Sequence, residues 1–238
     1  MPVTLDPLPV TPTFSPARPL AGMTVLVVED SRFASEAVRL LCLKSGARIR
    51  RADSLRSARR HLGVYMPSVV IVDLGLPDGS GISLITDLSA AHRIPVILAT
   101  SGDDRLFPDA IAAGADGVLE KPIESLGLFQ KAVLDHLPED QRPAFPRLVS
   151  NETVSPDAIA FRDDLSLAAD MLSSTEDENT LTYITQFLAG VARSARDDDL
   201  EAATMTLAAR RKNGGSFRSD LARVAGLLQD RIENTAVI

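Results

Sequence analysis

The sequence is short of several residue types, and each shortage restricts what the protein can be. A single cysteine among 238 residues excludes a disulfide within the chain and indicates a reducing compartment. No apolar run approaches the ~20 residues that span a bilayer, and the first residues lack the basic and apolar segments of a secretory signal. These absences predict a cytoplasmic protein with no membrane partner.

Histidine is also scarce, and its distribution excludes one function for part of the chain. The sequence has three histidines, and the last of them is His136. A histidine phosphotransfer domain needs a histidine exposed on a helix. The chain beyond His136 therefore cannot have that function.

Prolines mark the ends of the folded parts of the chain. Six of them fall within residues 1–22, which we expect to form a disordered tail. Pro138 and the stretch Pro143–Pro146 interrupt the pattern again, which indicates a linker over residues 138–154. What remains is two candidate domains, 23–137 and 155–238, each long enough to bury a core.

In the first candidate domain, short apolar runs alternate with amphipathic stretches. The predicted strands are Thr24–Val28, Arg48–Arg51, Val69–Val72, Pro95–Ala99 and Gly117–Leu119. The predicted helices lie near residues 31–44, 54–62, 80–91, 105–113 and 125–137. This alternation predicts β-α-β units, and therefore an α/β fold with a doubly wound five-stranded parallel sheet. In such sheets ligands bind beyond the carboxyl ends of the strands.

Acidic side chains follow two of the predicted strands. Glu29 and Asp30 come directly after the first strand, and Asp73 directly after the third. Parallel strands would bring these carboxylates to one edge, where a cation must offset their repulsion, and oxygen ligands of this kind suit Mg²⁺. Thr100 ends the strand that begins at Pro95, and Lys121 follows the fifth strand. Their hydroxyl and ammonium could hold a phosphoryl group there.

These residues carry a family resemblance. Residues 23–137 resemble the receiver domain of response regulators in two-component signalling, which has a flavodoxin-like fold. The matching segments are Val25–Asp30, Val72–Gly81, Pro95–Thr100 and Glu120–Pro122, in the family's order. The resemblance implies a phosphorelay protein with no enzyme activity beyond its own phosphotransfer and dephosphorylation.

The resemblance also implies a role for each residue. Asp73 would be the phosphoacceptor, with a histidine kinase or a phosphotransfer protein as the donor. Glu29 and Asp30 would hold Mg²⁺ together with Asp73, and the backbone carbonyl of Gly75 would be a further metal ligand.

Two more residues would act on the phosphoryl group itself. Thr100 would contact it after transfer, and Lys121 would pair with its oxygens, with a cis peptide bond between Lys121 and Pro122. One departure concerns the fifth strand, where Val118 replaces an aromatic residue that often follows the phosphorylated state in the family. Valine is stiff about its first torsion, so the loop after Thr100 is expected to carry the switch instead.

The positions two residues beyond Asp73 and Thr100 are both glycine, Gly75 and Gly102. Glycines there would leave the phosphorylated carboxylate open to water. We therefore expect a short-lived phosphoryl group.

Residues 155–238 predict four amphipathic helices packed as a bundle or as two hairpins. The expected helix starts are Ser155-Pro156-Asp157, a capping box at Thr175 and Glu178, Asp197–Asp199, and Ser216 after the turn Asn213-Gly214-Gly215.

The output of this helical segment has several candidate classes. Residues 150–238 hold 15 acidic and 9 basic residues, which disfavours nucleic-acid binding. A basic edge formed by Arg210-Arg211-Lys212, Arg218 and Arg223 keeps a DNA-binding transcriptional regulator as the alternative. The favoured prediction is a protein-interaction or dimerisation module.

Overall fold

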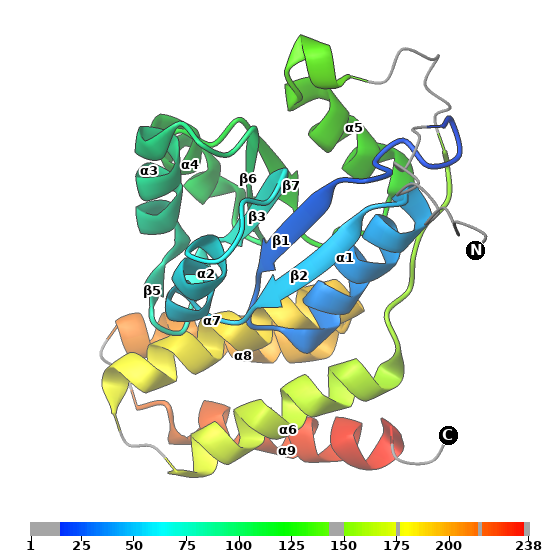
Figure 1. Ribbon diagram of the computed structural model, residues 1–238. Coiled ribbons are helices and arrows are strands. Elements are labelled where there is room, and N and C mark those ends of the chain that lie inside the picture. The colour runs from blue at the N-terminus through cyan, green and yellow to red at the C-terminus, as the bar shows by residue number, and fades with distance from the viewer. Residues whose placement is uncertain (1–14, 143–149, 175–176, 214–215, 236–238) are drawn as a thin grey trace, which may run out of the picture.

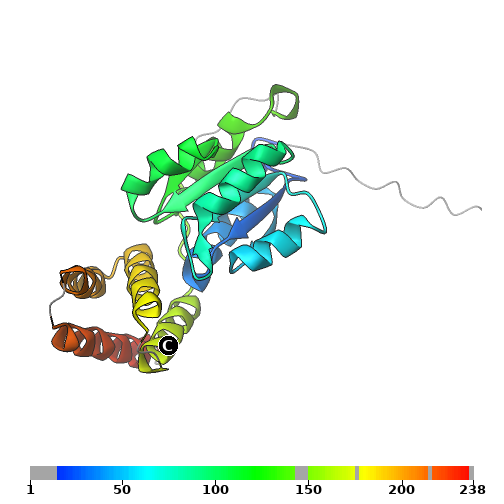
Figure 2. The same ribbon diagram turned by 90° about the vertical axis from the view of Figure 1, so that its left-hand side faces the viewer.

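The computed structural model describes residues 15–142, 150–174, 177–213 and 216–235. These residues form an α/β domain and a helical domain, which lie side by side in both views of the ribbon (Figure 1, Figure 2).

The α/β domain is built on a parallel sheet with strand order β2-β1-β3-β6-β7. Its strands are β1 (Thr24–Val28), β2 (Arg48–Ala52), β3 (Val69–Asp73), β6 (Val96–Ser101) and β7 (Gly117–Glu120). Every predicted strand is present, within two residues of its expected ends, so the predicted five-stranded fold is confirmed. A small antiparallel pair, β4 (Gly75–Leu76) and β5 (Gly79–Ser80), follows β3.

Helices cover both faces of this sheet. They are α1 (Arg32–Ser45), α2 (Leu55–Leu62), α3 (Gly81–Ala91), α4 (Phe107–Ala112) and α5 (Leu126–His136), with short 3-10 turns at Asp104–Leu106 and Glu139–Gln141. Successive residues of a strand point to opposite faces. Val25 and Val27 therefore pack with α1 and α5, whereas Leu26 and Val28 pack with α2, α3 and α4.

Serine fixes where most of these helices begin. Ser31, Ser54, Ser80 and Ser125 precede α1, α2, α3 and α5, and each hydroxyl accepts a hydrogen bond from a backbone N–H of the first turn. Such caps satisfy donors that have no partner within the helix. They place the first turn of α1 directly after the acidic pair that ends β1.

The helical domain contains the four predicted helices. These are α6 (Ala158–Ser174), α7 (Glu178–Ala195), α8 (Asp198–Lys212) and α9 (Arg218–Thr235). Each packs against two of the others, in the cyclic order α6-α7-α8-α9. Their apolar stripes meet in one core, which includes Leu165, Ile184, Leu188, Leu207 and Leu228. None of the helices described combines the length and apolar character needed to cross a membrane.

Aspartates rather than the expected residues cap two of these helices. Asp157 accepts a hydrogen bond from the N–H of Ala160 at 2.7 Å, so α6 starts after Asp157 and not after Ser155. Asp177 accepts from the N–H of Thr180 at 2.8 Å and caps α7, and Thr175 lies outside the described residues. A carboxylate caps as well as a hydroxyl and also offsets the positive end of the helix dipole. The third cap, Asp197 before α8, is confirmed.

The α/β domain extends beyond its expected ends. Leu20, placed in the tail from the sequence, is fully buried in the same core as Val25, so the expectation of disorder is wrong for that residue. Val154, placed in the linker, is buried in that core too, and its N–H bonds the carbonyl of Glu124 at 2.9 Å. Composition could not show this, because a single apolar side chain among prolines or polar residues gives no periodic pattern.

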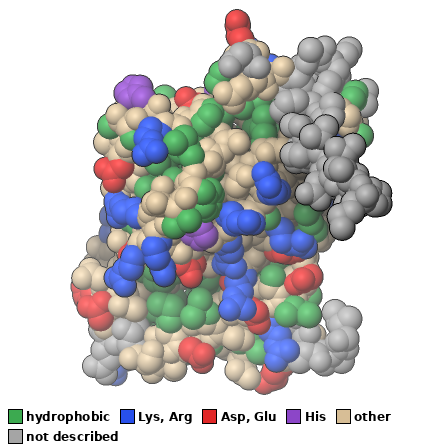
Figure 3. Space-filling view, viewed as in Figure 1, with side chains coloured by type: hydrophobic (Ala, Val, Ile, Leu, Met, Phe, Trp, Pro, Cys, Tyr) green, Lys and Arg blue, Asp and Glu red, His purple; other side chains and the backbone are tan. Residues whose placement is uncertain are grey.

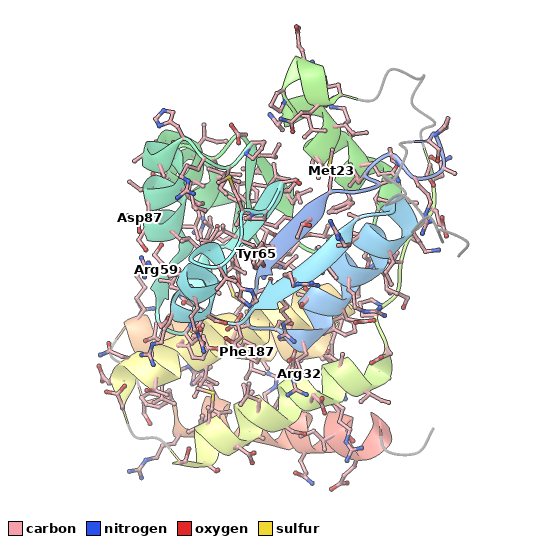
Figure 4. The ribbon with its side chains drawn as sticks, viewed as in Figure 1. Met23, Arg32, Arg59, Tyr65, Asp87 and Phe187 are labelled. Carbon is pink, nitrogen blue, oxygen red and sulfur yellow. The ribbon has the colours of Figure 1, made fainter. Side chains whose placement is uncertain are left out.

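The helical domain lies at the carboxyl ends of the strands. In Figure 1 the arrowheads of β1 and β2 point toward α7 and α8. Helices α6 and α7 both contact α1, and α7 also contacts β4. Figure 4 labels Arg32 and Phe187 on the two sides of this contact. The helical domain therefore covers the carboxyl edge of the sheet, where the predicted site residues lie.

Candidate functional site

Three carboxylates meet where β1 and β3 end. Glu29 and Asp30 directly follow β1, and Asp73 is the last residue of the neighbouring strand β3. One oxygen from each lies within 4.8 Å of the other two. Glu29 and Asp73 are buried, and Asp30 is half-buried. The prediction that these acids share one edge of the sheet is confirmed.

One ammonium group lies against this cluster. Lys121 follows β7, and its Nζ is 2.7 Å from Glu29 Oε2 and 3.0 Å from Asp73 Oδ2. Lys121 is only 7% exposed, so little water screens these contacts. The Lys121–Pro122 peptide bond is cis, as expected. One cation beside three carboxylates leaves an excess of negative charge.

Thr100 offers an unused hydroxyl at the next position across the sheet. It pairs in register with Asp73 and is buried. Its Oγ1 has no hydrogen-bond partner among the described residues. Leaving a buried hydroxyl unpaired costs about 1–3 kcal/mol. An oxygen-rich group arriving at Asp73 would supply the missing partner.

Burial and neighbouring charges shift the pKa values of Glu29, Asp30 and Lys121. Burial raises the pKa of Glu29 to about 8, and the Asp73 carboxylate adds to the rise while Lys121 opposes it. Burial and then the Asp73 charge raise the pKa of Asp30 to about 6. For Lys121, burial acts to lower the pKa, but the carboxylates of Asp73 and Glu29 outweigh it and raise the pKa above its usual range.

This donor set fits a divalent cation. All three side chains offer oxygen, which Mg²⁺ prefers, and their mutual repulsion is what a second cation would relieve. Gly75 lies directly beyond, and its N–H donates to Asp73 Oδ1 at 3.3 Å. It lines the same cavity as the three acids, while the metal-binding role of its carbonyl stays a prediction.

The raised pKa values predict a pH-dependent effect of Mg²⁺ on stability. Because Glu29 and Asp30 hold protons more tightly when folded than when unfolded, stability without metal should fall as the pH rises from about 5 to about 8. A metal that binds only the folded, deprotonated cluster should restore it. We expect Mg²⁺ to raise the melting temperature more at about pH 8 than at about pH 6.

Thermal melts at the two pH values, with and without Mg²⁺ at constant ionic strength, check this expectation. An equal gain at both values would contradict it, and so would a gain of the same size in the Asp30→Asn variant.

The helical domain contributes residues to this site that sequence reasoning missed. Tyr183 of α7 donates a hydrogen bond from its hydroxyl to Asp30 Oδ2 at 2.5 Å. Asp164 of α6 accepts from the Ser31 hydroxyl, and Arg196 pairs with Glu124. Of these residues, only Asp164 could have been noticed from the sequence, because this carboxylate falls on the apolar face of its helix, three residues after Phe161.

A cavity of about 680 Å³ lies between the two domains. The α/β domain lines it with Glu29, Asp30, Asp73 and Lys121, and the helical domain with Gln186, Gly190, Arg193 and Met205, among others. The acid cluster therefore faces a cavity that side chains of both domains line.

The two glycines beside the site differ in their surroundings. A Cβ added at Gly75 would meet nothing within 4 Å, as expected for an open position. A Cβ added at Gly102 would collide with the guanidinium of Arg193. Both glycines line the cavity, but Gly102 is the less open of the two, because the Arg193 side chain of α7 lies beside it.

Comparison with known proteins identifies the α/β domain. Residues 25–133 match the family model of the response regulator receiver domain. The KDP operon transcriptional regulatory protein KdpE of Escherichia coli is 33% identical over 163 residues, 67% of this chain and 68% of the relative. The virulence transcriptional regulatory protein PhoP of Salmonella typhimurium is 34% identical over 104 residues, 42% of this chain and 46% of the relative.

Solved structures match about half of the chain. A response regulator from Burkholderia pseudomallei, solved with a phosphorylated aspartic acid, calcium ion and citrate, is 28% identical. It aligns with 50% of this chain and 68% of its own, with a TM-score of 0.42. On the family model and the KdpE match, the chain belongs to the response regulators of two-component signalling, and residues 25–133 are its receiver domain.

Proposed function

We propose that Asp73 accepts a phosphoryl group in the presence of Mg²⁺, and that phosphorylation controls whether the helical domain stays docked on the receiver. The observation that carries this proposal is the position of Lys121 between Glu29 and Asp73, together with the unpaired hydroxyl of Thr100, the residue that pairs in register with Asp73. In this arrangement the Lys121 ammonium and the Thr100 hydroxyl are already in place to stabilise the negative charge that an aspartyl phosphate would add.

The donor would be a phosphohistidine of a kinase or of a phosphotransfer protein. A carboxylate oxygen of Asp73 forms the new bond to phosphorus as the bond from phosphorus to the imidazole nitrogen breaks. The bound metal would offset the charge on the phosphoryl oxygens. Lys121 would pair with one of the phosphoryl oxygens, and the Thr100 hydroxyl would donate a hydrogen bond to another.

The direct test is phosphorylation of the full chain by phosphoramidate with Mg²⁺. We expect an acid-stable, alkali-labile adduct that maps to Asp73 and is absent from Asp73→Asn. The matched control is Asp104→Asn, which removes an exposed carboxylate lining the same cavity. An adduct that persists in Asp73→Asn would refute the assignment.

The output we propose is a protein interaction, with a partner or with a second copy, made by the helical domain once it is released. The excess of acidic residues in this domain supports it, because phosphate backbones repel such a surface. Docking supports it further, because a surface held against the receiver becomes available only on release. A cytoplasmic location remains part of this proposal.

DNA binding remains the second candidate, since KdpE and PhoP are both named as transcriptional regulatory proteins. Two residues of the basic edge have other partners: Arg210 pairs with Asp220, and Arg211 donates to the carbonyl of Glu178. Figure 3 shows Lys and Arg side chains across the middle of this face, and exposed arginines are frequent in β2 and α2 of the receiver. They include the exposed Arg48, Arg50, Arg51, Arg56, Arg59 and Arg60.

A gel shift of the full chain at increasing salt separates the two outputs. Tight DNA binding that weakens steeply with salt would overturn the protein-interaction reading.

The open surroundings of Gly75 predict how long the phosphoryl group lasts. Since a Cβ at Gly75 meets no atom within 4 Å, Gly75→Arg should place a long side chain over the site and shield the acyl phosphate from water. This should slow dephosphorylation by about tenfold, or ~1.4 kcal/mol in the barrier. Gly75→Ala, whose methyl group is too short to cover Asp73, is the control. Loss of adduct after donor removal measures the rate, and an unchanged rate in Gly75→Arg would contradict the expectation.

A further inference from the structure

The helical domain holds the segment that follows the acidic pair. Asp164 of α6 is buried, with 1% of its surface exposed. Its carboxylate accepts from the Ser31 hydroxyl at 2.7 Å and from the backbone N–H groups of Arg32 and Phe33 at 2.8 and 3.0 Å. A carboxylate from one domain therefore caps the first turn of α1 in the other.

Other contacts surround this cap. Phe33 and Phe161 pack with ring centroids 5.5 Å apart, and Arg32 pairs with Asp163 at 2.6 Å. The apolar contact and the buried carboxylate make docking specific to this face of the receiver. The first turn of α1, and with it Asp30, is held by the docked helices.

Tyr183 of the helical domain also contacts the acid cluster. Its hydroxyl donates to Asp30 Oδ2 at 2.5 Å, while Asp30 Oδ1 accepts from the N–H of Ser31 at 3.0 Å. Both oxygens of Asp30 therefore have hydrogen-bond donors in the docked state. The phenol packs beside Phe187 of the same helix, with ring centroids 5.9 Å apart.

Magnesium would need the Asp30 carboxylate as a ligand. It binds oxygen at about 2.0–2.1 Å in a near-octahedral shell and keeps several of its waters. Asp30 Oδ2 already accepts a hydrogen bond from the Tyr183 hydroxyl, which makes this oxygen a weaker ligand for the ion. The phenol also occupies space beside the same oxygen. A docked Tyr183 therefore opposes a hydrated ion at Asp30.

We propose that Tyr183 is a positioning residue that competes with Mg²⁺ for Asp30, so that metal binding and docking of the helical domain oppose each other. This inference rests on the proposed metal site at Glu29, Asp30 and Asp73. Coupling of this kind is reciprocal: the factor by which docking weakens the metal is the factor by which the metal weakens docking. The helical domain thus regulates metal binding by the receiver, as well as responding to phosphorylation of the receiver.

Calorimetric titration of the full chain with Mg²⁺ tests the competition. Tyr183→Phe keeps the ring and removes the hydroxyl. It should bind Mg²⁺ about tenfold more tightly than the wild type, the change expected for ~1.4 kcal/mol from a hydrogen bond to a charged group. Tyr65→Phe is the matched control, because the Tyr65 hydroxyl bonds His61 and not the cluster. It should leave the affinity unchanged.

Amide exchange gives a readout that does not depend on phosphorylation. The N–H groups of Arg32 and Phe33 are protected by Asp164, so Mg²⁺ should speed their exchange in the wild type. Asp164→Asn weakens docking without touching the phenol. It should also tighten Mg²⁺ binding, which keeps the proposal testable if Tyr183→Phe folds poorly.

The outcomes distinguish failure of the competition from failure of the metal site. If Asp30→Asn abolishes Mg²⁺ binding while Tyr183→Phe and Asp164→Asn bind like the wild type, the competition is wrong and the metal site stands. If Asp30→Asn binds Mg²⁺ as tightly as the wild type, the metal site is wrong and the competition fails with it. Tighter binding in both docking variants, with faster exchange on adding Mg²⁺ to the wild type, supports the proposal.

Discussion

Replacing Lys121 with methionine should lower the rate of phosphorylation by phosphoramidate by about 10²–10³-fold, the usual effect of removing one group that stabilises developing charge. Lys121 contacts both Glu29 and Asp73 while almost fully buried, so no other described side chain replaces it there. Methionine keeps much of the length and loses the charge. The measurement is the rate of adduct formation at saturating Mg²⁺.

The same variant should be less stable. Breaking a buried ion pair from one side costs about 3–5 kcal/mol, because the remaining carboxylates lose their cation. Lys131→Met is the control, since Lys131 is exposed and pairs with Asp135 on the surface of α5, where about 0.3–0.5 kcal/mol is at stake. A Lys121→Met protein phosphorylated at the wild-type rate would contradict the role given to this lysine.

Leu188→Ala should destabilise the helical domain by about 2–5 kcal/mol. Leu188 is fully buried in the core where α6, α7, α8 and α9 meet. Removing most of its side chain loses apolar contact and leaves a cavity that rigid helices fill poorly. Urea unfolding followed by circular dichroism measures the change.

A second leucine provides the comparison. Leu167 of α6 is 47% exposed, so Leu167→Ala should change the free energy of unfolding by less than about 0.5 kcal/mol. Since the receiver has its own core, Leu188→Ala should still form the adduct at Asp73. Equal stabilities of the two variants would contradict the assignment of the bundle core.

Local sequence patterns predicted most of the receiver. Strands such as Val69–Asp73 are short apolar runs bounded by turns, and parallel strands end at one edge, so the meeting of Asp30 and Asp73 follows from strand ends alone. Leu20 was missed because one buried side chain in a proline-rich segment has no period to reveal it.

The contribution of the helical domain to the site could not be predicted in the same way. Tyr183 lies 153 residues from Asp30 in sequence, and its helix gives no sign of which surface it will meet. Asp164 was the one available clue, since a carboxylate on an apolar helix face needs a buried partner. Naming that partner required the relative placement of the two domains.

Docking over the proposed phosphorylation site gives the helical domain two roles. It is the segment expected to carry the output, and it contacts Asp30 through Tyr183 and the first turn of α1 through Asp164. Val118 stands where the family often has an aromatic residue, so a route through Asp30 and α1 offers a different coupling from receiver to output.

We propose that phosphorylation at Asp73 releases the helical domain. Amide exchange at Arg32 and Phe33 tests it directly, before and after treatment with phosphoramidate and Mg²⁺, in the wild type and in Asp73→Asn. We expect faster exchange at both amides after treatment of the wild type, beyond the effect of Mg²⁺ alone, and no such increase in Asp73→Asn. Full protection of these amides in a wild-type protein shown to carry the adduct would contradict it.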